Sequence, residues 1–138
     1  SAARQRPAVR AKARARILVA EDSDVIREAI RRELTRAGFE VVAAEDGAVA
    51  LERARAELFD AVSTDVMMPK LDGYELTRAL RQDPRYENVP IVMVTSKDAR
   101  IDTLRGMDAG ADLYLTKPAD ATELVRALDS LLAKRKNG

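Results

Sequence analysis

The sequence predicts an α/β domain in which helices cover both faces of a parallel β-sheet. Short apolar segments of four to six residues alternate with longer segments whose apolar residues recur at helical spacing. This alternation occurs five times, and neighbouring parallel strands need crossover connections of this kind. The chain has 138 residues, which is the size of one domain. A single doubly wound sheet therefore accounts for the pattern.

The amino-terminal half of the chain supplies two strands and two helices. Residues 17–20 are continuously apolar, as in a strand buried on both faces, and residues 39–44 form the second strand. A helix is predicted from Asp24 to Gly38, a residue type that commonly ends helices. Its apolar residues are Val25, Ile26, Ala29, Ile30, Leu34 and Ala37. A second helix is predicted over residues 48–58, with an inward face formed by Ala50, Leu51, Ala54 and Leu58.

The carboxyl-terminal half continues the alternation with three strands and three helices. The strands are predicted over residues 60–64, 90–94 and 111–115, and the helices over residues 71–80, 101–107 and 120–133. Gly110 is expected to end the fourth helix in a left-handed conformation. The last helix has an apolar stripe formed by Leu124, Val125, Leu128, Leu131 and Leu132.

The composition excludes several classes of chemistry, because the chain contains neither histidine nor cysteine. Disulfides, thiolate nucleophiles, imidazole bases and zinc sites built from these residues are ruled out. No apolar run approaches the roughly 18 residues that span a membrane, and the basic start lacks the apolar stretch of a secretory signal. We therefore expect a cytoplasmic protein, without membrane insertion, whose chemistry relies on carboxylates, hydroxyls, lysines and arginines.

The charge is unevenly distributed along the chain. The net charge is +1, but residues 1–16 carry six basic residues and no acid, so that the remainder carries −5. This stretch has no aromatic side chain that could stack on bases, and we expect no direct binding to nucleic acid. We predict a basic Ala/Arg-rich linker or tail at residues 1–15, a domain over residues 16–134 and a short tail at 135–138.

Polar residues that could form a site follow the ends of four predicted strands. Glu21 and Asp22 follow the first strand, Asp65 the third, Thr95 the fourth and Lys117 the fifth. Sites in doubly wound sheets form at the carboxyl ends of the strands, so these side chains are expected to converge. A single acid at a strand end is most often a turn or capping residue. The joint placement at four strand ends favours a functional site.

Three converging carboxylates repel one another unless a cation joins them. Oxygen ligands without histidine or cysteine indicate magnesium, with manganese as the alternative. Lys117 and Thr95 at the same edge would complete a pocket for a phosphoryl group. A carboxylate in that pocket can itself act as the nucleophile and form an acyl phosphate.

Four segments, in this order, resemble the motifs of one family. They are Ile-Leu-Val-Ala-Glu-Asp-Ser at residues 17–23, Asp-Val-Met-Met-Pro-Lys-Leu-Asp-Gly at 65–73, Val-Met-Val-Thr-Ser at 92–96 and Tyr-Leu-Thr-Lys-Pro at 114–118. They look like the receiver domain of two-component response regulators, of the CheY-like kind, over about residues 16–134. The resemblance implies a flavodoxin-like (βα)5 fold with strand order 2-1-3-4-5. It also implies transfer of a phosphoryl group from a phosphohistidine on a sensor histidine kinase or phosphotransfer domain.

The resemblance implies a role for each residue of the site. Asp65 matches the phosphoacceptor. Asp22 and Asp65 match direct Mg²⁺ ligands, and Glu21 matches a residue that usually binds the ion through water. The backbone carbonyl of Met67 is the expected additional ligand, and Lys117 is expected to pair with the phosphoryl oxygens.

Thr95 and Tyr114 match the switch pair of the family. Phosphorylation would draw Thr95 and Lys117 toward the new charge, and Tyr114 would turn inward into the space behind Thr95. The surface of the fourth helix, fifth strand and fifth helix is expected to change and to regulate an effector or a parent kinase. The expected protein is therefore a phosphoacceptor with self-catalysed transfer and autodephosphorylation, not an enzyme that turns over an external substrate.

Two other functions compete with this one. A receiver-like module could bind proteins independently of phosphorylation, although no residue of the acidic site is missing. Hydrolases of the haloacid dehalogenase kind also combine Asp, Thr or Ser, Lys and magnesium. They resemble a different pattern, because a second Asp follows their nucleophile by two residues, where this chain has Met67.

No DNA-binding helix pair follows the last predicted helix, so we expect a detached, single-domain or carboxyl-terminal receiver. The Glu-Asp-Ser segment and the Val-Thr-Ser-Lys-Asp run are similar to receivers at the end of chemotaxis-type hybrid histidine kinases.

Overall fold

The computed structural model of the chain describes residues 15–95, 108–116 and 121–137, and its centre is a five-stranded parallel sheet. The strands are ordered β2-β1-β3-β4-β5, so the doubly wound topology and the strand order 2-1-3-4-5 are confirmed. Their bounds are β1 Arg16–Ala20, β2 Glu40–Ala44, β3 Ala61–Asp65, β4 Ile91–Thr95 and β5 Leu113–Thr116.

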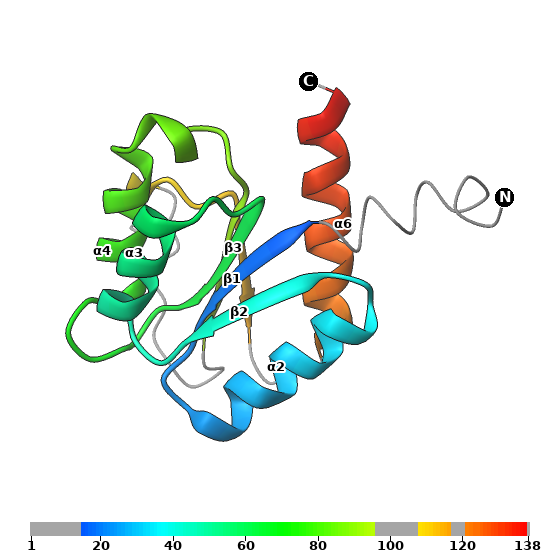
Figure 1. Ribbon diagram of the computed structural model, residues 1–138, viewed down its shortest axis with the longest axis horizontal. Helices are drawn as coiled ribbons and strands as arrows, with labels where there is room; N and C mark the ends of the chain where they lie inside the picture. Colours follow the sequence, from blue (N-terminus) through cyan, green and yellow to red (C-terminus); the bar gives the residue numbers. More distant parts are fainter. Residues whose placement is uncertain (1–14, 96–107, 117–120, 138) are drawn as a thin grey trace, which may run out of the picture.

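Helices cover both faces of this sheet (Figure 1). One face carries α2 (Asp24–Arg36) and α6 (Ala121–Asn137), and the other carries α3 (Gly47–Ala56) and α4 (Gly73–Arg81). A short 3₁₀ turn, η1 (Pro84–Tyr86), follows α4 and was not predicted from the sequence. The predicted helix over residues 101–107 lies outside the described residues.

Side-chain caps fix where α2, α3 and α4 begin. The Ser23 hydroxyl accepts a hydrogen bond from the backbone of Ile26 at the start of α2, and the Asp46 carboxylate accepts one from Val49 at the start of α3. Asp72 and Glu75 form a capping box at the start of α4. Asp72 is therefore the N-cap of α4. Gly38 after α2 has a φ of 103° and Gly110 before β5 a φ of 109°, the left-handed conformation that glycine adopts without strain.

The apolar pattern of the sequence did not predict burial correctly at two places. Val25 and Ile26, at the start of the apolar repeat in α2, are 80% and 36% exposed. Leu58 was expected on the inward face of a helix over residues 48–58, but its side chain is 59% exposed. The helix α3 ends at Ala56, and Glu57 is already extended, with a φ of −137° and a ψ of 157°. Helical periodicity therefore no longer applies at position 58. The other described strands and helices differ from their predicted bounds by no more than about four residues.

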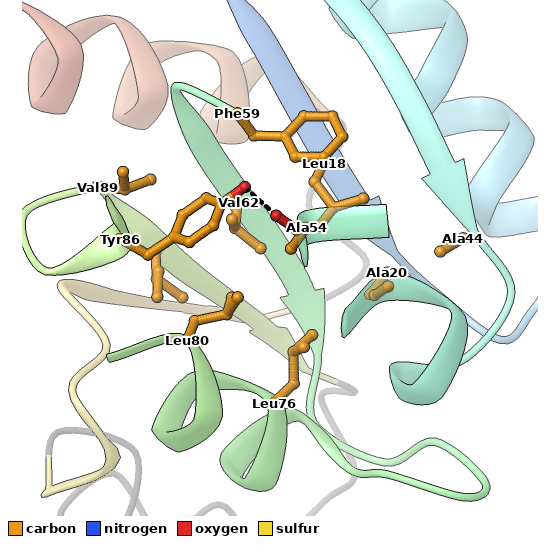
Figure 2. Close-up of a cluster of buried hydrophobic side chains, with 12 residues drawn as sticks. Leu18, Ala20, Ala44, Ala54, Phe59, Val62, Leu76, Leu80, Tyr86 and Val89 are labelled. Atoms are coloured by element: carbon orange, nitrogen blue, oxygen red, sulfur yellow. Dashed lines mark hydrogen bonds between the residues drawn. The ribbon is translucent and has the colours of Figure 1, made fainter. Parts of the chain in front are cut away.

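The core has two layers because the central strands bury side chains on both faces. Leu18 points to α3 and α4, whereas Ile17 and Val19 point to α2 and α6. Figure 2 shows the first layer, which includes Leu18, Ala54, Phe59, Val62, Leu76 and Leu80. Tyr86 completes it, and its hydroxyl donates to the carbonyl oxygen of Ala54 at 2.7 Å. Burial raises the pKa of Tyr86, so this hydroxyl remains a donor at neutral pH.

Arg81, at the end of α4, ties the sheet edge that carries β5 to the rest of the domain. Its guanidinium donates to the carbonyl oxygens of Gly110 and Val89, at 2.9 and 2.7 Å, and pairs with the carboxylate of Asp112 at 2.9 Å. Asp112 also accepts a hydrogen bond from the backbone of Ile91 at 2.8 Å. Because Asp112 directly precedes β5, these contacts hold the start of that strand in register with β4.

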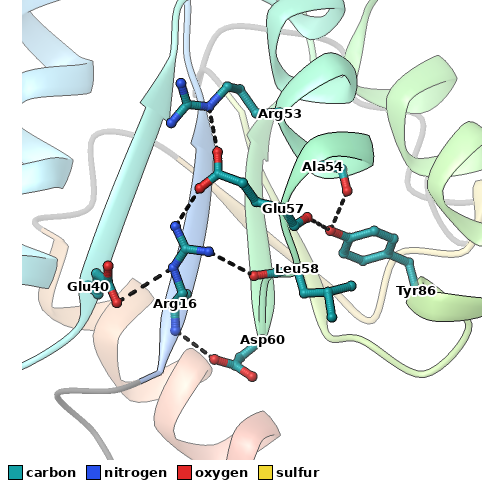
Figure 3. A network of polar contacts seen from close by, with 8 residues as sticks. All are labelled: Arg16, Glu40, Arg53, Ala54, Glu57, Leu58, Asp60 and Tyr86. Carbon is teal, nitrogen blue, oxygen red and sulfur yellow. Dashed lines mark hydrogen bonds and ion pairs between the residues drawn. The ribbon is translucent and has the colours of Figure 1, made fainter.

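Arg16, the first residue of β1, makes contacts at the amino-terminal ends of β2 and β3 (Figure 3). Its side chain pairs with Glu57 at 2.7 Å and with Glu40 at 3.5 Å, and it donates to the carbonyl oxygen of Leu58 at 3.2 Å. Its backbone N–H donates to the Asp60 carboxylate at 2.7 Å. Arg16 is thus anchored by its side chain and by its backbone at this end of the sheet.

The pairing of Glu57 with Arg16 is expected to make the stability of the domain depend on pH. The hydrogen bond from Arg16 lowers the pKa of Glu57 below its usual 4.5, against the opposing effect of burial. A carboxylate with a lowered folded-state pKa stabilises the protein above its unfolded-state pKa and loses that contribution as the pH falls. We expect Glu57→Gln to reduce the free energy of unfolding at neutral pH, with a difference from wild type that shrinks below about pH 4.5.

Urea unfolding followed by far-ultraviolet circular dichroism at neutral and acidic pH measures this difference. Glu40→Gln is the matched control, because the Glu40 carboxylate is farther from Arg16 and 56% exposed. A difference between Glu57→Gln and wild type that is the same at both pH values would contradict the prediction.

Candidate functional site

Three carboxylates meet at the carboxyl end of the sheet. Glu21 and Asp22 directly follow β1, and Asp65 is the last residue of β3, the strand paired with β1. One carboxylate oxygen from each of the three lies within 4.8 Å of the others. Glu21 and Asp65 are buried, whereas Asp22 is exposed. The predicted convergence of these acids is therefore present in the structure.

Backbone groups hold two of these carboxylates in place. The N–H of Ser23 donates to Oε2 of Glu21 at 3.0 Å, and the N–H of Val66 donates to Oδ1 of Asp65 at 2.7 Å. The Arg27 guanidinium, from the first turns of α2, donates to the backbone carbonyl of Glu21 at 2.9 Å. Sequence reasoning missed Arg27, because this contact goes to a backbone atom. The carboxylates are thus positioned by main-chain donors, which move less than side chains do.

The loop after Asp65 is packed tightly against the start of α4. The N–H of Gly73 donates to the carbonyl oxygen of Val66 at 2.8 Å. A Cβ atom at Gly73 would lie 2.1 Å from the carbonyl oxygen of Asp65. This approach is possible only for glycine, so Gly73 sets the path of the chain just beyond Asp65.

Thr95 lies beside the acids, at the end of β4. In the register of β3 and β4, Asp65 pairs with Val94, the residue before Thr95. The Thr95 side chain is fully buried, and its Oγ1 has no hydrogen-bond partner among the described residues. A buried hydroxyl without a partner costs about 1–3 kcal/mol. Thr95 therefore offers a hydrogen-bond donor that an anionic oxygen at this edge would satisfy.

Tyr114 lies on β5, the strand paired with the strand of Thr95, and is offset from Thr95 by two positions in the register. Tyr114 pairs with Met93, and Thr95 pairs with Thr116. The hydroxyl of Tyr114 lies 2.9 Å from the hydroxyl of Tyr74, a residue of α4. Sequence reasoning did not single out Tyr74, because no periodicity relates a ring on a helix to a ring on a strand 40 residues away.

Of the two remaining candidate residues, Met67 lies among the described residues and Lys117 does not. Met67 lies in the loop after β3, and its side chain is 67% exposed. A ligand role for its backbone carbonyl stays a prediction. Lys117 lies outside the described residues, and its role stays a prediction as well.

The donor set fits a hard divalent cation. Three carboxylate oxygens at one edge are the ligands that Mg²⁺ and Mn²⁺ prefer, and the cation would offset the repulsion among them. No helix in the described part of the chain is long and apolar enough to cross a membrane.

Comparison with known sequences gives one consistent result. Residues 17–129 match the family described as the response regulator receiver domain. The response regulator MprA of Mycobacterium ulcerans is 42% identical over 121 residues, which cover 88% of this chain and 51% of MprA. The chain thus spans about half the length of the curated relatives that it matches.

Solved structures of receiver domains share the fold. The chemotaxis response regulator CheY4 of Vibrio cholerae is 34% identical with a TM-score of 0.79, over 85% of this chain and 98% of CheY4. The receiver domain of the sensor histidine kinase PA1611 from Pseudomonas aeruginosa PAO1 is 33% identical with a TM-score of 0.80, over 86% of this chain and 98% of that one. That domain was crystallised with a magnesium ion coordinated in its active site cleft. Together with the acidic edge of the sheet, these matches mean that the chain belongs to the receiver domains of two-component response regulators, a family of signalling phosphoacceptor switches.

Proposed function

We propose that Asp65 is the phosphoacceptor and that Mg²⁺ is the metal of this site. The observation that carries the proposal is the convergence of the Glu21, Asp22 and Asp65 oxygens within 4.8 Å at the end of β1 and β3. The buried Thr95 hydroxyl at the neighbouring strand end supports it, because its Oγ1 has no partner among the described residues. The matched family and the magnesium-bound PA1611 receiver support the choice of metal.

The proposed transfer joins an oxygen of Asp65 to phosphorus. The carboxylate attacks the phosphorus of a phosphohistidine donor, the O–P bond forms as the P–N bond breaks, and the imidazole nitrogen keeps the bonding electron pair and is then protonated by solvent. Bound Mg²⁺ would supply positive charge to the phosphoryl oxygens. Attack by water on the phosphorus later releases inorganic phosphate and regenerates the carboxylate.

Thr95 and Lys117 are proposed to bind the phosphoryl oxygens once Asp65 is phosphorylated. Thr95 donates its hydroxyl hydrogen to a phosphoryl oxygen, and Lys117 pairs with another. The movement of Thr95 changes the space available to Tyr114 on β5, and the surface around β5 and α6 changes with it. This coupling is an equilibrium between two arrangements, so phosphorylation shifts their populations.

The proposed partners follow from this chemistry. A histidine kinase or phosphotransfer domain supplies the phosphoryl group, and an effector or a parent kinase recognises the changed surface. The chemotaxis-type hybrid kinase, the cytoplasmic location, the domain bounds and the role of residues 1–15 stay predictions.

Intact-mass analysis tests the proposed function directly. The chain is incubated with a small acyl phosphate or phosphoramidate, once with Mg²⁺ and once with excess chelator. A phosphoryl adduct that forms only with Mg²⁺ is expected. Absence of an adduct, with Mg²⁺ binding shown separately, would favour the phosphorylation-independent binding module.

Asp22→Asn is expected to weaken Mg²⁺ binding, because it removes one of the three charges that face the ion. The loss should be about tenfold or more, as for other residues that support a metal site. Isothermal titration calorimetry with Mg²⁺ measures it. Asp24→Asn is the control, because Asp24 is exposed, pairs with Arg27 and lies outside the acid cluster. Equal affinities of the two variants would argue against Asp22 as a ligand.

Lys117→Ala is expected to permit slow phosphorylation of Asp65 and to uncouple it from Tyr114. Asp65 and the other two acids remain, but the positive charge that pairs with the phosphoryl oxygens is lost. The adduct is followed by mass and the environment of Tyr114 by NMR. A Tyr114 response as large as that of the wild-type chain would contradict the role of Lys117.

A further inference from the structure

The hydrogen bond between Tyr74 and Tyr114 connects α4 with β5. The loop that joins Asp65 to α4 is called the acceptor loop below. The two hydroxyl oxygens are 2.9 Å apart. Tyr74 is 6% exposed and belongs to a small buried cluster with Val66, Met93, Ala109 and Ala111, against which the partly buried ring of Tyr114 packs.

Tyr74 is firmly attached to the chain next to Asp65. It directly follows Gly73, whose N–H bonds to the carbonyl oxygen of Val66 at 2.8 Å. The Thr77 hydroxyl donates to the Gly73 carbonyl at 2.8 Å and holds the first turn of α4. These contacts hold the backbone of Tyr74 in place relative to the acceptor loop.

Tyr114 occupies the other side of the same cluster. It pairs with Met93, which is fully buried and precedes Thr95 by two residues on the same face of β4. The ring of Tyr114 is partly buried and packs against this cluster, so the ring that bonds to the Tyr74 hydroxyl is turned toward the cluster and not out into solvent. A ring turned toward solvent would exchange this bond for water.

We propose that Tyr74 is a positioning residue of the switch, and that its hydroxyl stabilises the inward position of Tyr114. The inference rests on the proposed function, in which the inward position accompanies phosphorylation. The bond joins the Tyr114 hydroxyl to a buried residue of the cluster in this position, and an intramolecular hydrogen bond of this kind contributes about 0.5–1.5 kcal/mol. The hydroxyl of Tyr74 thereby raises the population of the inward position of Tyr114.

A quantitative consequence follows for a phosphoryl analogue. A ligand that favours one arrangement binds more weakly when that arrangement becomes less populated. Loss of one hydrogen bond of ordinary strength changes the ratio of the two Tyr114 positions by about five-fold. Tyr74→Phe keeps the ring and removes only the hydroxyl, so the apparent affinity for beryllofluoride with Mg²⁺ should fall by up to that factor.

The position of Tyr114 can be observed directly, because the chain has only three tyrosines. With 3-fluorotyrosine incorporated, each ring gives one ¹⁹F signal, which Tyr→Phe substitutions assign. Tyr74→Phe is expected to raise the solvent exposure of Tyr114, measured by relaxation from a soluble paramagnetic agent, without beryllofluoride. Tyr86→Phe is the matched control, because it also removes a buried hydroxyl donor but belongs to a different hydrophobic cluster from Tyr74 and Tyr114.

A double substitution separates a role through Tyr114 from a general role in α4. Beryllofluoride titrations with Mg²⁺, followed by the ¹⁹F signal of Tyr86, which all these variants retain, give the midpoint for wild type, Tyr74→Phe, Tyr114→Phe and the double variant. If Tyr114→Phe already removes the bond, adding Tyr74→Phe should change the midpoint no further. The same weakening by Tyr74→Phe in both backgrounds would overturn the proposal.

The outcomes also separate this inference from the proposed function. A wild-type chain that does not respond to beryllofluoride and Mg²⁺ contradicts the proposed switch itself. A wild-type response, together with an unchanged Tyr114 exposure or an unchanged or lower midpoint in Tyr74→Phe, contradicts only the role of Tyr74. Thermal unfolding of each variant confirms that the folded chain is being compared.

Discussion

Asp65→Asn is expected to abolish the phosphoryl adduct that the wild-type chain forms with a small acyl phosphate and Mg²⁺. An amide is a far weaker nucleophile than a carboxylate, and the substitution removes one of the three charges that face the metal. The shape of the side chain is retained, and an amide oxygen can still accept the hydrogen bond from the Val66 N–H. The fold should therefore persist while the chemistry is lost, as intact-mass analysis and circular dichroism of the same sample would show.

Asp72→Asn is the matched control for this experiment. Asp72 lies in the same loop and caps α4, a role that Asn performs equally well. Its adduct should form at a rate close to that of the wild-type chain. An adduct on Asp65→Asn at the wild-type level would place the acceptor elsewhere and contradict the proposed chemistry.

The acidic edge could be predicted because strand ends are visible in the sequence. The apolar run at residues 17–20 stops at Glu21, and Asp65 follows a buried run in the same way. In a parallel sheet such ends share one edge, so their convergence follows from topology. The caps at Asp72 and the glycine at position 110 follow from local chemistry, which the sequence also displays.

Contacts that depend on the relative placement of two elements could not be predicted in this way. The bond between Tyr74 and Tyr114 requires the exact crossing of α4 and β5, which no short-range pattern encodes. The exposure of Leu58 depends on where α3 ends, and an apolar residue at helical spacing does not reveal that end. The close approach of Gly73 to the backbone of Asp65 likewise appears only in three dimensions.

Gly73→Ala is expected to destabilise the domain and to slow phosphorylation of Asp65. At the first position of a helix, replacement of glycine by alanine usually stabilises by about 0.4–1 kcal/mol, because the unfolded chain loses freedom. Here the added Cβ would lie 2.1 Å from the carbonyl oxygen of Asp65, so the backbone must move. Overpacking of this kind costs about 1–3 kcal/mol, which reverses the sign of the usual effect. Urea unfolding measures the free energy of unfolding. The rate of adduct formation reports whether Asp65 is still positioned for phosphorylation.

Gly47→Ala distinguishes a steric cost from an effect on the acceptor. Gly47 is also the first residue of a helix with an Asp cap, and its added Cβ would lie 2.0 Å from the carbonyl oxygen of Leu71. The two variants should lose comparable stability. Only Gly73→Ala presses on the backbone of Asp65, so only this variant should slow the adduct strongly under conditions in which both are folded. A Gly73→Ala variant as stable as the wild-type chain would contradict the close contact between Gly73 and the carbonyl oxygen of Asp65. If both variants slowed the adduct equally, the effect would come from the loop as a whole and not from the carbonyl of Asp65.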